Sequence, residues 1–385
     1  MTLKVSRRGS IPPFIVMDVM RAAAERAKAG GDVLHLEVGQ PSTGAPARVI
    51  EAARAALGAD TLGYTDALGL PHLREAIARH YRDWYGVAVD PARIVVTTGS
   101  SGAFLLAFLA AFEPGDRVAL AAPSYPAYRN ILRAVGVIPV ELPAGPEHRY
   151  QAVPALLDRL PPGIDGLIVA SPANPTGAML TPDEVGEVAR RCEACGIRLV
   201  SDEIYHGLTY GTEAATALAS SDEAIVINSF SKYFSMTGWR LGWMVVPPAL
   251  MRAVECLAQN LYISPPSLSQ HAAVAVFEAH DELRRNVERY AANRALLLEE
   301  LPKAGFDRLA PADGAFYLYA DVAHLTNDSE AFCRAMLADL AIAATPGIDF
   351  DPDRGRSTLR FSFAGSTATM AEAARRLQGW KRKAP

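Results

Sequence analysis

Short apolar runs alternate with helix-like segments from Arg93 onward. The runs are five or six residues long and rich in valine, isoleucine, leucine and alanine: 93–97, 117–121, 137–141, 166–170, 197–202 and 224–228. Helical patterns occupy intervals between them: 99–112, 123 to about 135, and 182–195. Apolar runs of this length are typical of strands buried on both faces. The alternation therefore predicts an α/β layer with a mostly parallel sheet between helices.

The ends of the chain follow a different pattern. Before residue 93 we expect helices at 14–30, 46–57 and 71–85 and a short strand at 33–38. A long helical region from 248 to about 301 is interrupted at 263–266 by Ile-Ser-Pro-Pro. Strands at 314–320 and 359–363 then alternate with helices at 329–340 and 367–380, which predicts a second, smaller α+β layer.

This pattern suggests a division of the chain into three parts. We expect an N-terminal arm and helix over 1–45, which pack with the smaller layer. A large domain would span 46–275, and a small C-terminal α+β domain would span 276–385.

Composition narrows the class of protein. The net charge of −4 argues against a nucleic-acid-binding surface. The longest apolar run, 103–112, is too short to cross a bilayer. The four cysteines are too scattered for a disulfide framework, which favours the cytoplasm. Cys192 and Cys195 have no second pair, and the eight histidines show no ligand spacing, so we expect no metal site.

The stretch from Asn228 to Arg240 contains the most unusual residue of the chain. Lys232 is the only lysine between residues 28 and 303, although arginines are frequent there. A solvated surface would not select a single lysine at this place. Chemistry that needs a neutral primary amine would, because lysine releases its proton and arginine does not. Lys232 is therefore the first candidate for a catalytic residue.

Polar residues follow five of the predicted strands. In open parallel sheets, ligands bind at the carboxyl ends of the strands. The residues that would converge there are Ser100 and Ser101, Tyr125, Asn174, Asp202 with Tyr205, and Ser229 with Lys232.

Each of these motifs also has a plain structural reading. The Gly-Ser-Ser-Gly turn at 99–102 caps a helix whether or not its N–H groups bind a phosphate. Asp202 ends an apolar strand, so it needs a donor, which is either a neighbouring residue or the nitrogen of a ligand. Asn174 lies in Asn-Pro-Thr-Gly, a common turn sequence. Only their combination favours one shared site.

Together the motifs resemble the class I/II aminotransferases, pyridoxal-phosphate enzymes of fold type I. The resemblance extends from about residue 5 to 380. Ser-Phe-Ser-Lys at 229–232, followed by Met-Thr-Gly-Trp-Arg-Leu-Gly at 236–242, is its strongest motif. Supporting motifs occur in the family's order: Tyr64 ahead of Gly69, Asn-Pro-Thr-Gly at 174–177, Asp-Glu-Ile-Tyr at 202–205, Gly-Ala-Phe-Tyr at 314–317, and Leu-Arg-Phe-Ser at 359–362.

The resemblance implies a role for each candidate. Lys232 would hold pyridoxal 5'-phosphate as a Schiff base and serve as general acid and base. Asp202 would pair with the ring nitrogen, Tyr205 and Asn174 would bind the ring's 3-oxygen, and Tyr125 would stack on the ring. The phosphate would be bound by Ser100, Ser101, Ser229, Ser231 and Arg240. Arg360 would bind the substrate carboxylate, helped by Asn174 and the backbone at Gly39.

The resemblance also implies an assembly and a reaction. Tyr64 would reach the phosphate in a neighbouring subunit, so we expect a homodimer with shared sites. The reaction would move an amino group between an L-amino acid and a 2-oxo acid in a ping-pong mechanism. The 102–112 helix contains no cation for a second carboxylate, so we expect small or hydrophobic, non-acidic substrates. A carbon–sulfur β-lyase of the same fold is the alternative, because it would use the same lysine, aspartate and arginine.

Overall fold

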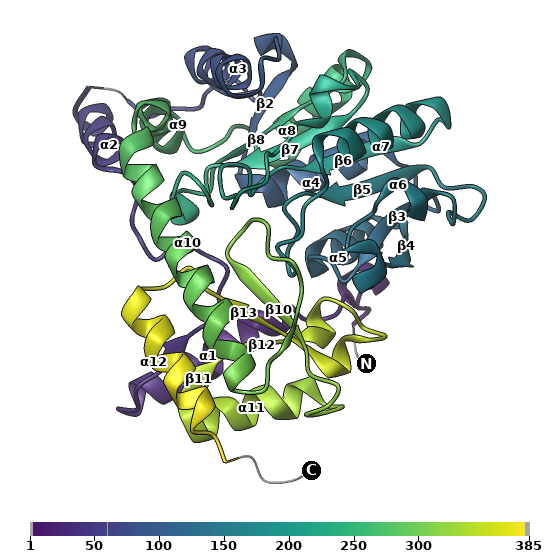
Figure 1. Cartoon of the computed structure of the whole chain (residues 1–385). Coiled ribbons are helices and arrows are strands. Elements are labelled where there is room, and N and C mark those ends of the chain that lie inside the picture. Colours follow the sequence, from purple (N-terminus) through teal and green to yellow (C-terminus); the bar gives the residue numbers. More distant parts are fainter. Residues whose placement is uncertain (1–2, 60, 382–385) are drawn as a thin grey trace.

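The computed structural model describes residues 3–59 and 61–381 and contains two separate groups of β-strands (Figure 1). The larger group is a seven-stranded sheet in the order β2-β8-β7-β6-β5-β3-β4. Its strands are β2 (Ile94–Thr97), β3 (Arg117–Ala122), β4 (Ile138–Pro143), β5 (Gly166–Ala170), β6 (Arg198–Asp202), β7 (Ile225–Ser229) and β8 (Gly242–Val245). All neighbours pair in parallel except β8, which is antiparallel to β2 and β7.

Helices cover both faces of this sheet because its strands are apolar on both faces. All four residues of β2 are buried, and they alternate between two cores. Ile94 and Val96 pack in the cluster that contains Leu73 of α3, whereas Val95 packs in the cluster that contains Phe108 of α4. The helices of this part are α2 (Ala47–Ala59), α3 (Pro71–Tyr85), α4 (Gly99–Ala111), α5 (Pro126–Val135), α6 (Pro154–Leu157), α7 (Pro182–Ala194), α8 (Met251–Leu261) and α9 (Ser267–Ala273).

The smaller group of strands is antiparallel. Its sheet has the order β12-β13-β10-β9, and a separate parallel pair joins β1 to β11. The strands are β1 (Leu34–His35), β9 (Arg308–Leu309), β10 (Tyr317–Asp321), β11 (Ile342–Ala343), β12 (Thr345–Pro346) and β13 (Thr358–Ser362). The helices near them are α1 (Ile15–Lys28), α10 (His280–Lys303), α11 (Ser329–Leu340) and α12 (Thr367–Gln378), and α10 extends from α9 to this sheet (Figure 1).

The predicted fold class is confirmed: the chain is α/β, with a mostly parallel mixed sheet and a smaller antiparallel sheet. The helix predicted at 71–85, the helix predicted at 329–340 and the strand predicted at 166–170 have the predicted bounds. The division at residues 45 and 275 remains a prediction, and the outer ends of its first and last parts, residues 1–2 and 382–385, lie outside the described residues.

One predicted strand is shorter in the structure, and one strand was not predicted at all. The strand predicted at 33–38 contains only residues 34–35, because Leu36 O already accepts a hydrogen bond from Ser362 N of β13. The sequence reading did not include β8, whose antiparallel course makes the sheet mixed. At Gly242 in β8 an added Cβ would lie 2.9 Å from the backbone of Gly99 and Ser100, so this glycine lets the sheet approach the start of α4 closely.

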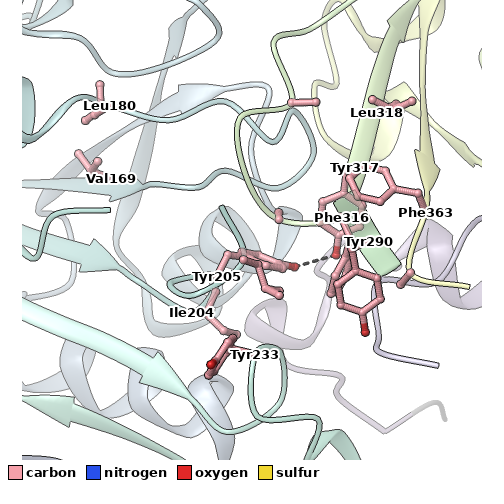
Figure 2. Packing of buried hydrophobic residues seen from close by; sticks show 14 of the residues in the cluster. Val169, Leu180, Ile204, Tyr205, Tyr233, Tyr290, Phe316, Tyr317, Leu318 and Phe363 are labelled. Atoms are coloured by element: carbon pink, nitrogen blue, oxygen red, sulfur yellow. Dashed lines mark hydrogen bonds between the residues drawn. The ribbon is translucent and has the colours of Figure 1, made fainter. Parts of the chain in front are cut away.

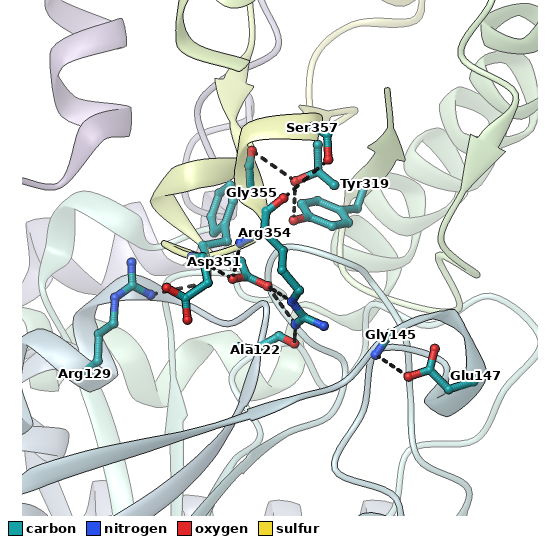
Figure 3. A network of polar contacts seen from close by, with 12 residues as sticks. Ala122, Arg129, Gly145, Glu147, Tyr319, Asp351, Arg354, Gly355 and Ser357 are labelled. Carbon is teal, nitrogen blue, oxygen red and sulfur yellow. Dashed lines mark hydrogen bonds and ion pairs between the residues drawn. The ribbon is translucent and has the colours of Figure 1, made fainter. Parts of the chain in front are cut away.

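A polar cluster joins the loop after β12 to the large sheet (Figure 3). The guanidinium of Arg354 binds Asp351 and the carbonyl of Ala122, which ends β3. On α5, the buried Arg129 donates to the carbonyls of Asp349 and Phe350. These contacts fix the loop beside the carboxyl ends of the large sheet's strands.

Candidate active site

A cavity of about 470 Å³ lies at the carboxyl ends of the central parallel strands. Residues from α1, the 38–40 segment, α4, α5, β6, the loop after β7 and the smaller sheet all contribute to its wall. The cavity brings together nearly all the predicted site residues: Gly39, Ser100, Ser101, Tyr125, Asn174, Asp202, Tyr205, Ser231, Lys232, Arg240 and Arg360. The polar residues at the strand ends therefore lie together in the structure, as the sequence predicts.

Asp202 is a buried carboxylate at the end of β6. Its two oxygens accept hydrogen bonds from Tyr128 Oη and from the backbone N–H of Ile204. Burial raises the pKa of the Asp202 carboxyl to about 6, although both hydrogen bonds and the charge of Lys232 oppose the rise. The carboxylate is thus poorly solvated, and a cationic N–H in the cavity would stabilise its charge.

Lys232 lies on the same cavity wall, and its Nζ donates to the carbonyl of Gly39. Burial lowers the pKa of the Lys232 amine to about 8, and the charge of Arg360 contributes to the fall. Asp202 opposes the fall, and Arg240 adds to it. A substantial share of the amine is therefore neutral near pH 8, which nucleophilic or general-base chemistry requires.

Arg360, in the middle of β13, is a buried cation that has no carboxylate partner. Its side chain donates to Asn174 Oδ1 at 2.7 Å and to the carbonyl of Glu37. The Nε atom is buried without a hydrogen-bond partner, and no ion pair within the described part of the chain includes this arginine. A buried guanidinium needs a counter-charge, and a carboxylate matches its planar fork.

The N-terminus of α4 also lines the cavity and has the features of an anion-binding site. Thr98 precedes the helix without capping it, so the first N–H groups lack a side-chain acceptor. The guanidinium of Arg240 lies beside this turn, and a Cβ on Gly99 would be only 2.6 Å from Arg240 Nη2. Gly99 has φ +73° and leaves this space free. Ser100 and Ser101 add two hydroxyls, a combination that suits a phosphate.

Two predicted residues do not line the cavity. Ser229 Oγ lies behind the wall, 3.0 Å from Ser231 Oγ, and accepts from the Ser231 N–H. Its hydroxyl can brace Ser231 but does not face the cavity. Tyr64 projects from the surface between α2 and α3 and is 83% exposed. Tyr64 therefore has no contact with the site of its own chain.

Several residues that line the cavity were not among the site residues predicted from the sequence. Tyr128 is one helical turn after Tyr125, a spacing that puts both on one face of α5, and this could have been recognised. Tyr317 belongs to a motif that was noticed without a role. Phe14, Met17 and Met20 form an apolar wall from the start of α1. Their position depends on tertiary structure, because the start of the helix is held by one residue, Asp349, more than 300 positions away.

Two kinds of feature are absent from the part of the chain that the structure describes. No group of three or more metal-ligating side chains is present within residues 3–59 and 61–381. Within the same ranges, no helix is both long and apolar enough to traverse a lipid bilayer.

Comparisons with known proteins agree with one another. The family model described as aminotransferase class I and II matches residues 31–377. Valine–pyruvate aminotransferase of Mycobacterium tuberculosis is 54% identical over 384 residues, which cover 99% of each chain. The crystal structure of an aminotransferase from the same organism, also 54% identical, has a TM-score of 0.97 and covers 98% of this chain and 99% of that one.

A more distant structure has the same fold. The aspartate aminotransferase from Thermus thermophilus with maleate is 30% identical, with a TM-score of 0.92 over 98% of this chain and all of that one. The family match spans most of the sequence, and the cavity joins a lysine, a buried aspartate and a buried arginine in one place. The chain belongs to the class I and II aminotransferases.

Proposed function

We propose that this aminotransferase uses pyridoxal 5'-phosphate and prefers non-acidic L-amino acids, with valine and pyruvate as the first substrate pair to test. One observation carries the proposal. A single cavity contains the Lys232 amine, the unpaired Arg360 guanidinium and an apolar wall from α1. The first suits a carbonyl group, the second a carboxylate, and the third an apolar side chain.

The cavity residues fit the cofactor in charge and shape. The uncapped start of α4, with Ser100, Ser101 and Arg240, would bind its phosphate. When bound, the cofactor supplies an electron sink that stabilises negative charge at the substrate α-carbon. Asp202 would bind the ring N–H, and the same contact would relieve the poor solvation of its carboxylate.

The remaining contacts would come from three side chains. Tyr125 would cover one ring face, while Tyr205 and Asn174 would donate to the ring's 3-oxygen. The Asn174 amide is already oriented, because its oxygen accepts from Arg360 and its nitrogen is left free to donate. Ser229 would act indirectly, by holding Ser231 in place.

Lys232 would have two tasks, covalent attachment and proton transfer. As a neutral amine it takes a proton at Nζ from the substrate α-carbon, for which its lowered pKa is suited. The carbonyl of Gly39 accepts a hydrogen bond from Nζ and thereby orients the amine. Arg360 holds the substrate carboxylate, so that the α-carbon is presented to Lys232 in a constant orientation.

The residues of the cavity wall also support a preference for substrates without a second carboxylate. Its cations among the described residues are Lys232, Arg240 and Arg360, and each has a proposed task. A second substrate carboxylate would thus face Phe14, Met17 and Met20 without a counter-charge. Among the named relatives, valine–pyruvate aminotransferase at 54% identity agrees better with such a wall than the aspartate enzyme at 30%.

We also propose a homodimer in which Tyr64 completes the neighbouring site. A second cavity of about 610 Å³ shares Gln40, Thr237 and Arg240 with the first, so it leads from the surface to the phosphate side of the site. Thr65 N donates to Ser264 Oγ, two residues before Pro266 of this second cavity, and the neighbouring side chains of Tyr64 and Ile263 are exposed. A loop from a second copy could enter there.

A substrate screen tests the proposed function. The purified protein with pyridoxal phosphate and pyruvate is offered valine, leucine, phenylalanine and aspartate, and the alanine formed is measured. Valine should exceed aspartate by at least tenfold in kcat/KM. Activity with aspartate well above the other donors would overturn the substrate preference. Release of pyruvate and ammonia from cystathionine without an acceptor 2-oxo acid would instead favour the β-lyase.

A further inference from the structure

We propose that Tyr317 is a positioning residue that joins the cofactor side of the site, at Tyr205, to the substrate side, at Arg360. The inference rests on the proposed function. It gives a role to Tyr317, which has none in the proposed reaction and does not follow a strand of the large sheet. Three independent contacts of Tyr317 support it.

The first contact is a hydrogen bond between two buried phenols. Tyr317 Oη lies 2.7 Å from Tyr205 Oη, and Figure 2 shows the two side chains pointing toward each other. Their rings are 5.7 Å apart and nearly perpendicular, at 78°. Both side chains are almost completely buried, so water does not compete for this bond. Tyr205 is thus held by a specific partner on the smaller sheet.

The second contact is between the Tyr317 ring and Arg360. The guanidinium carbon is 4.3 Å from the ring centroid, within the range of a cation–π interaction. Tyr317 lies on β10 and Arg360 on the neighbouring strand β13. Arg360 pairs directly with Tyr319, so Tyr317, two residues before it, is a diagonal neighbour of Arg360 on the same sheet face. The ring therefore packs against the guanidinium without using its N–H groups, of which Nε has no hydrogen-bond partner and can donate to a carboxylate.

The third contact is with the chain segment that binds Lys232. A Cβ on Gly39 would lie 2.0 Å from Tyr317 Oη, so only glycine lets the segment pass this hydroxyl. The carbonyl of the same glycine accepts from Lys232 Nζ. Tyr317 consequently contacts Tyr205, Arg360 and the glycine whose carbonyl accepts from Lys232.

The direction of the hydrogen bond follows from the task of Tyr205. If Tyr205 donates its proton to the ring oxygen of the cofactor, its own oxygen must accept from Tyr317. A hydrogen bond received at the Tyr205 oxygen makes Tyr205 a stronger donor. Tyr317 thereby increases the pull of Tyr205 on the negative charge of the ring oxygen.

Tyr317→Phe tests this step, because it removes the hydroxyl and keeps the ring. A weaker Tyr205 donor leaves more negative charge on the ring oxygen, which favours the protonated form of the bound cofactor. The pH titration of the visible absorbance should therefore move upward by roughly half a pH unit. Tyr319→Phe is the matched control: it removes a buried hydroxyl on the same strand, which pairs with Thr358 at 2.7 Å instead. This control should titrate like the wild type.

A double variant shows whether the effect passes through Tyr205. In a Tyr205→Phe background, adding Tyr317→Phe should cause no further shift, because the donor that Tyr317 strengthens is gone. Tyr317→Leu removes the ring as well, and should weaken the binding of 3-methylbutanoate, a carboxylate analogue of valine without its amine, by roughly 3- to 30-fold relative to Tyr317→Phe. Thermal unfolding of every variant confirms that it is folded.

The outcomes are distinguishable. An unchanged titration in folded Tyr317→Phe, or an equal shift in Tyr319→Phe, would overturn the inference. An additive shift in the double variant would also overturn it, since Tyr317 would then act independently of Tyr205. A wild-type protein that binds no pyridoxal phosphate, and so lacks the visible absorbance, overturns the proposed function and the inference together.

Discussion

Lys232 and Arg360 are cations in the same cavity, and their different chemistry separates their tasks. The guanidinium of the arginine is a planar fork that matches the two oxygens of a carboxylate. The lysine loses its proton more readily because it is surrounded by protein and lies near two arginines. Each of the two residue types is therefore suited to one task and unsuited to the other.

The lowered pKa of Lys232 predicts a pH dependence of stability in the protein without cofactor. The amine titrates near 10.5 when unfolded and near 8 when folded, so unfolding takes up a proton between these values. The free energy of unfolding of the wild type should rise with pH from 8 toward 10.5, relative to Lys232→Met, by about 2 kcal/mol. Urea unfolding of both proteins at pH 7.5, 9 and 10 measures this. Parallel pH profiles would show that the lysine is not perturbed.

Removal of Arg360 should separate substrate binding from cofactor binding. Arg360→Ala loses the bidentate contact with the substrate carboxylate, so KM for amino and 2-oxo acids should rise by about 100-fold. The visible absorbance of the bound cofactor should persist, because Lys232, Asp202 and the phosphate-binding residues are unchanged and only Asn174 among the proposed cofactor contacts loses a hydrogen bond from the guanidinium. Steady-state kinetics with a cofactor titration provide the check. Loss of cofactor at unchanged KM would contradict the assignment.

The site residues could be predicted at this scale, but most of their partners could not. Lys232, Asp202 and Arg360 each stand in a short motif whose residue type reveals its chemistry. Tyr317 hydrogen-bonds a residue 112 positions away, and its choice of partner depends on how two sheets meet. Ser229 belongs to the same motif, but its hydroxyl hydrogen-bonds the carbonyl of Leu241, a partner that the sequence does not reveal.

At the scale of elements, the helix α1 depends on a residue far away in the sequence. Its N-cap, Phe14, makes no side-chain cap. Instead the buried carboxylate of Asp349 accepts from the backbone N–H groups of Ile15 at 3.1 Å and Val16 at 3.2 Å. A carboxylate is favourable at a helix N-terminus, where the N–H groups lack partners. Asp349 thus holds the start of α1, and with it the apolar wall, over the cavity.

Substitution of Asp349 should therefore alter substrate selectivity. Asp349→Ala leaves the start of α1 uncapped, at a cost of about 1 kcal/mol or more, and loosens the wall formed by Phe14 and Met17. We expect kcat/KM for valine to fall roughly tenfold and for alanine clearly less, because alanine has less side chain to cover. Kinetics with both donors give the ratio.

Asp18→Ala provides the matched control for this experiment. It removes a carboxylate from the same first turn, but one that faces solvent and pairs with Arg21. Its valine-to-alanine ratio should equal that of the wild type. An equal loss for both donors in Asp349→Ala would indicate general destabilisation and would refute the role of the wall.

Helices were predicted with the correct bounds where the local sequence pattern favours the same structure that tertiary packing requires. The helices at 71–85 and 329–340 have strong end signals: proline at the first position in one, and in the other Asp328, whose side chain accepts from Ala331 N. The strand β8 was missed although Gly238 and Pro247 flank it, because its four residues directly follow the Lys232 loop and the described stretch between β7 and β8 contains no α-helix. Its antiparallel pairing is set by the two neighbouring strands.

At the scale of the whole molecule, Tyr64 is the residue whose predicted role requires two chains to assemble. Its predicted task lies in a neighbouring subunit, and in its own chain the side chain is exposed. Tyr64→Phe should weaken pyridoxal phosphate binding by roughly tenfold through the loss of one hydrogen bond to phosphate. Sedimentation should give twice the mass of one chain.

Mixed dimers separate a shared site from a self-contained one. When Lys232→Ala chains are recombined with Tyr64→Phe chains, a shared arrangement creates one site per mixed dimer with both Lys232 and Tyr64 intact. This site should bind the cofactor with wild-type affinity and should be active. If no recombined site recovers wild-type affinity, Tyr64 serves its own chain, whereas unchanged affinity in the Tyr64→Phe homodimer would show that Tyr64 has no part in binding.

The proposed reaction depends most directly on Lys232, which would both attach the cofactor and transfer the proton. Lys232→Ala removes the only side-chain amine that lines the cavity among residues 3–59 and 61–381. The variant should remain folded and bind pyridoxal phosphate without covalent attachment, as judged by the loss of cofactor on gel filtration in denaturant after borohydride reduction. Its transamination of valine with pyruvate should fall by at least 10⁴-fold. A variant that transaminates at the normal rate would contradict the account.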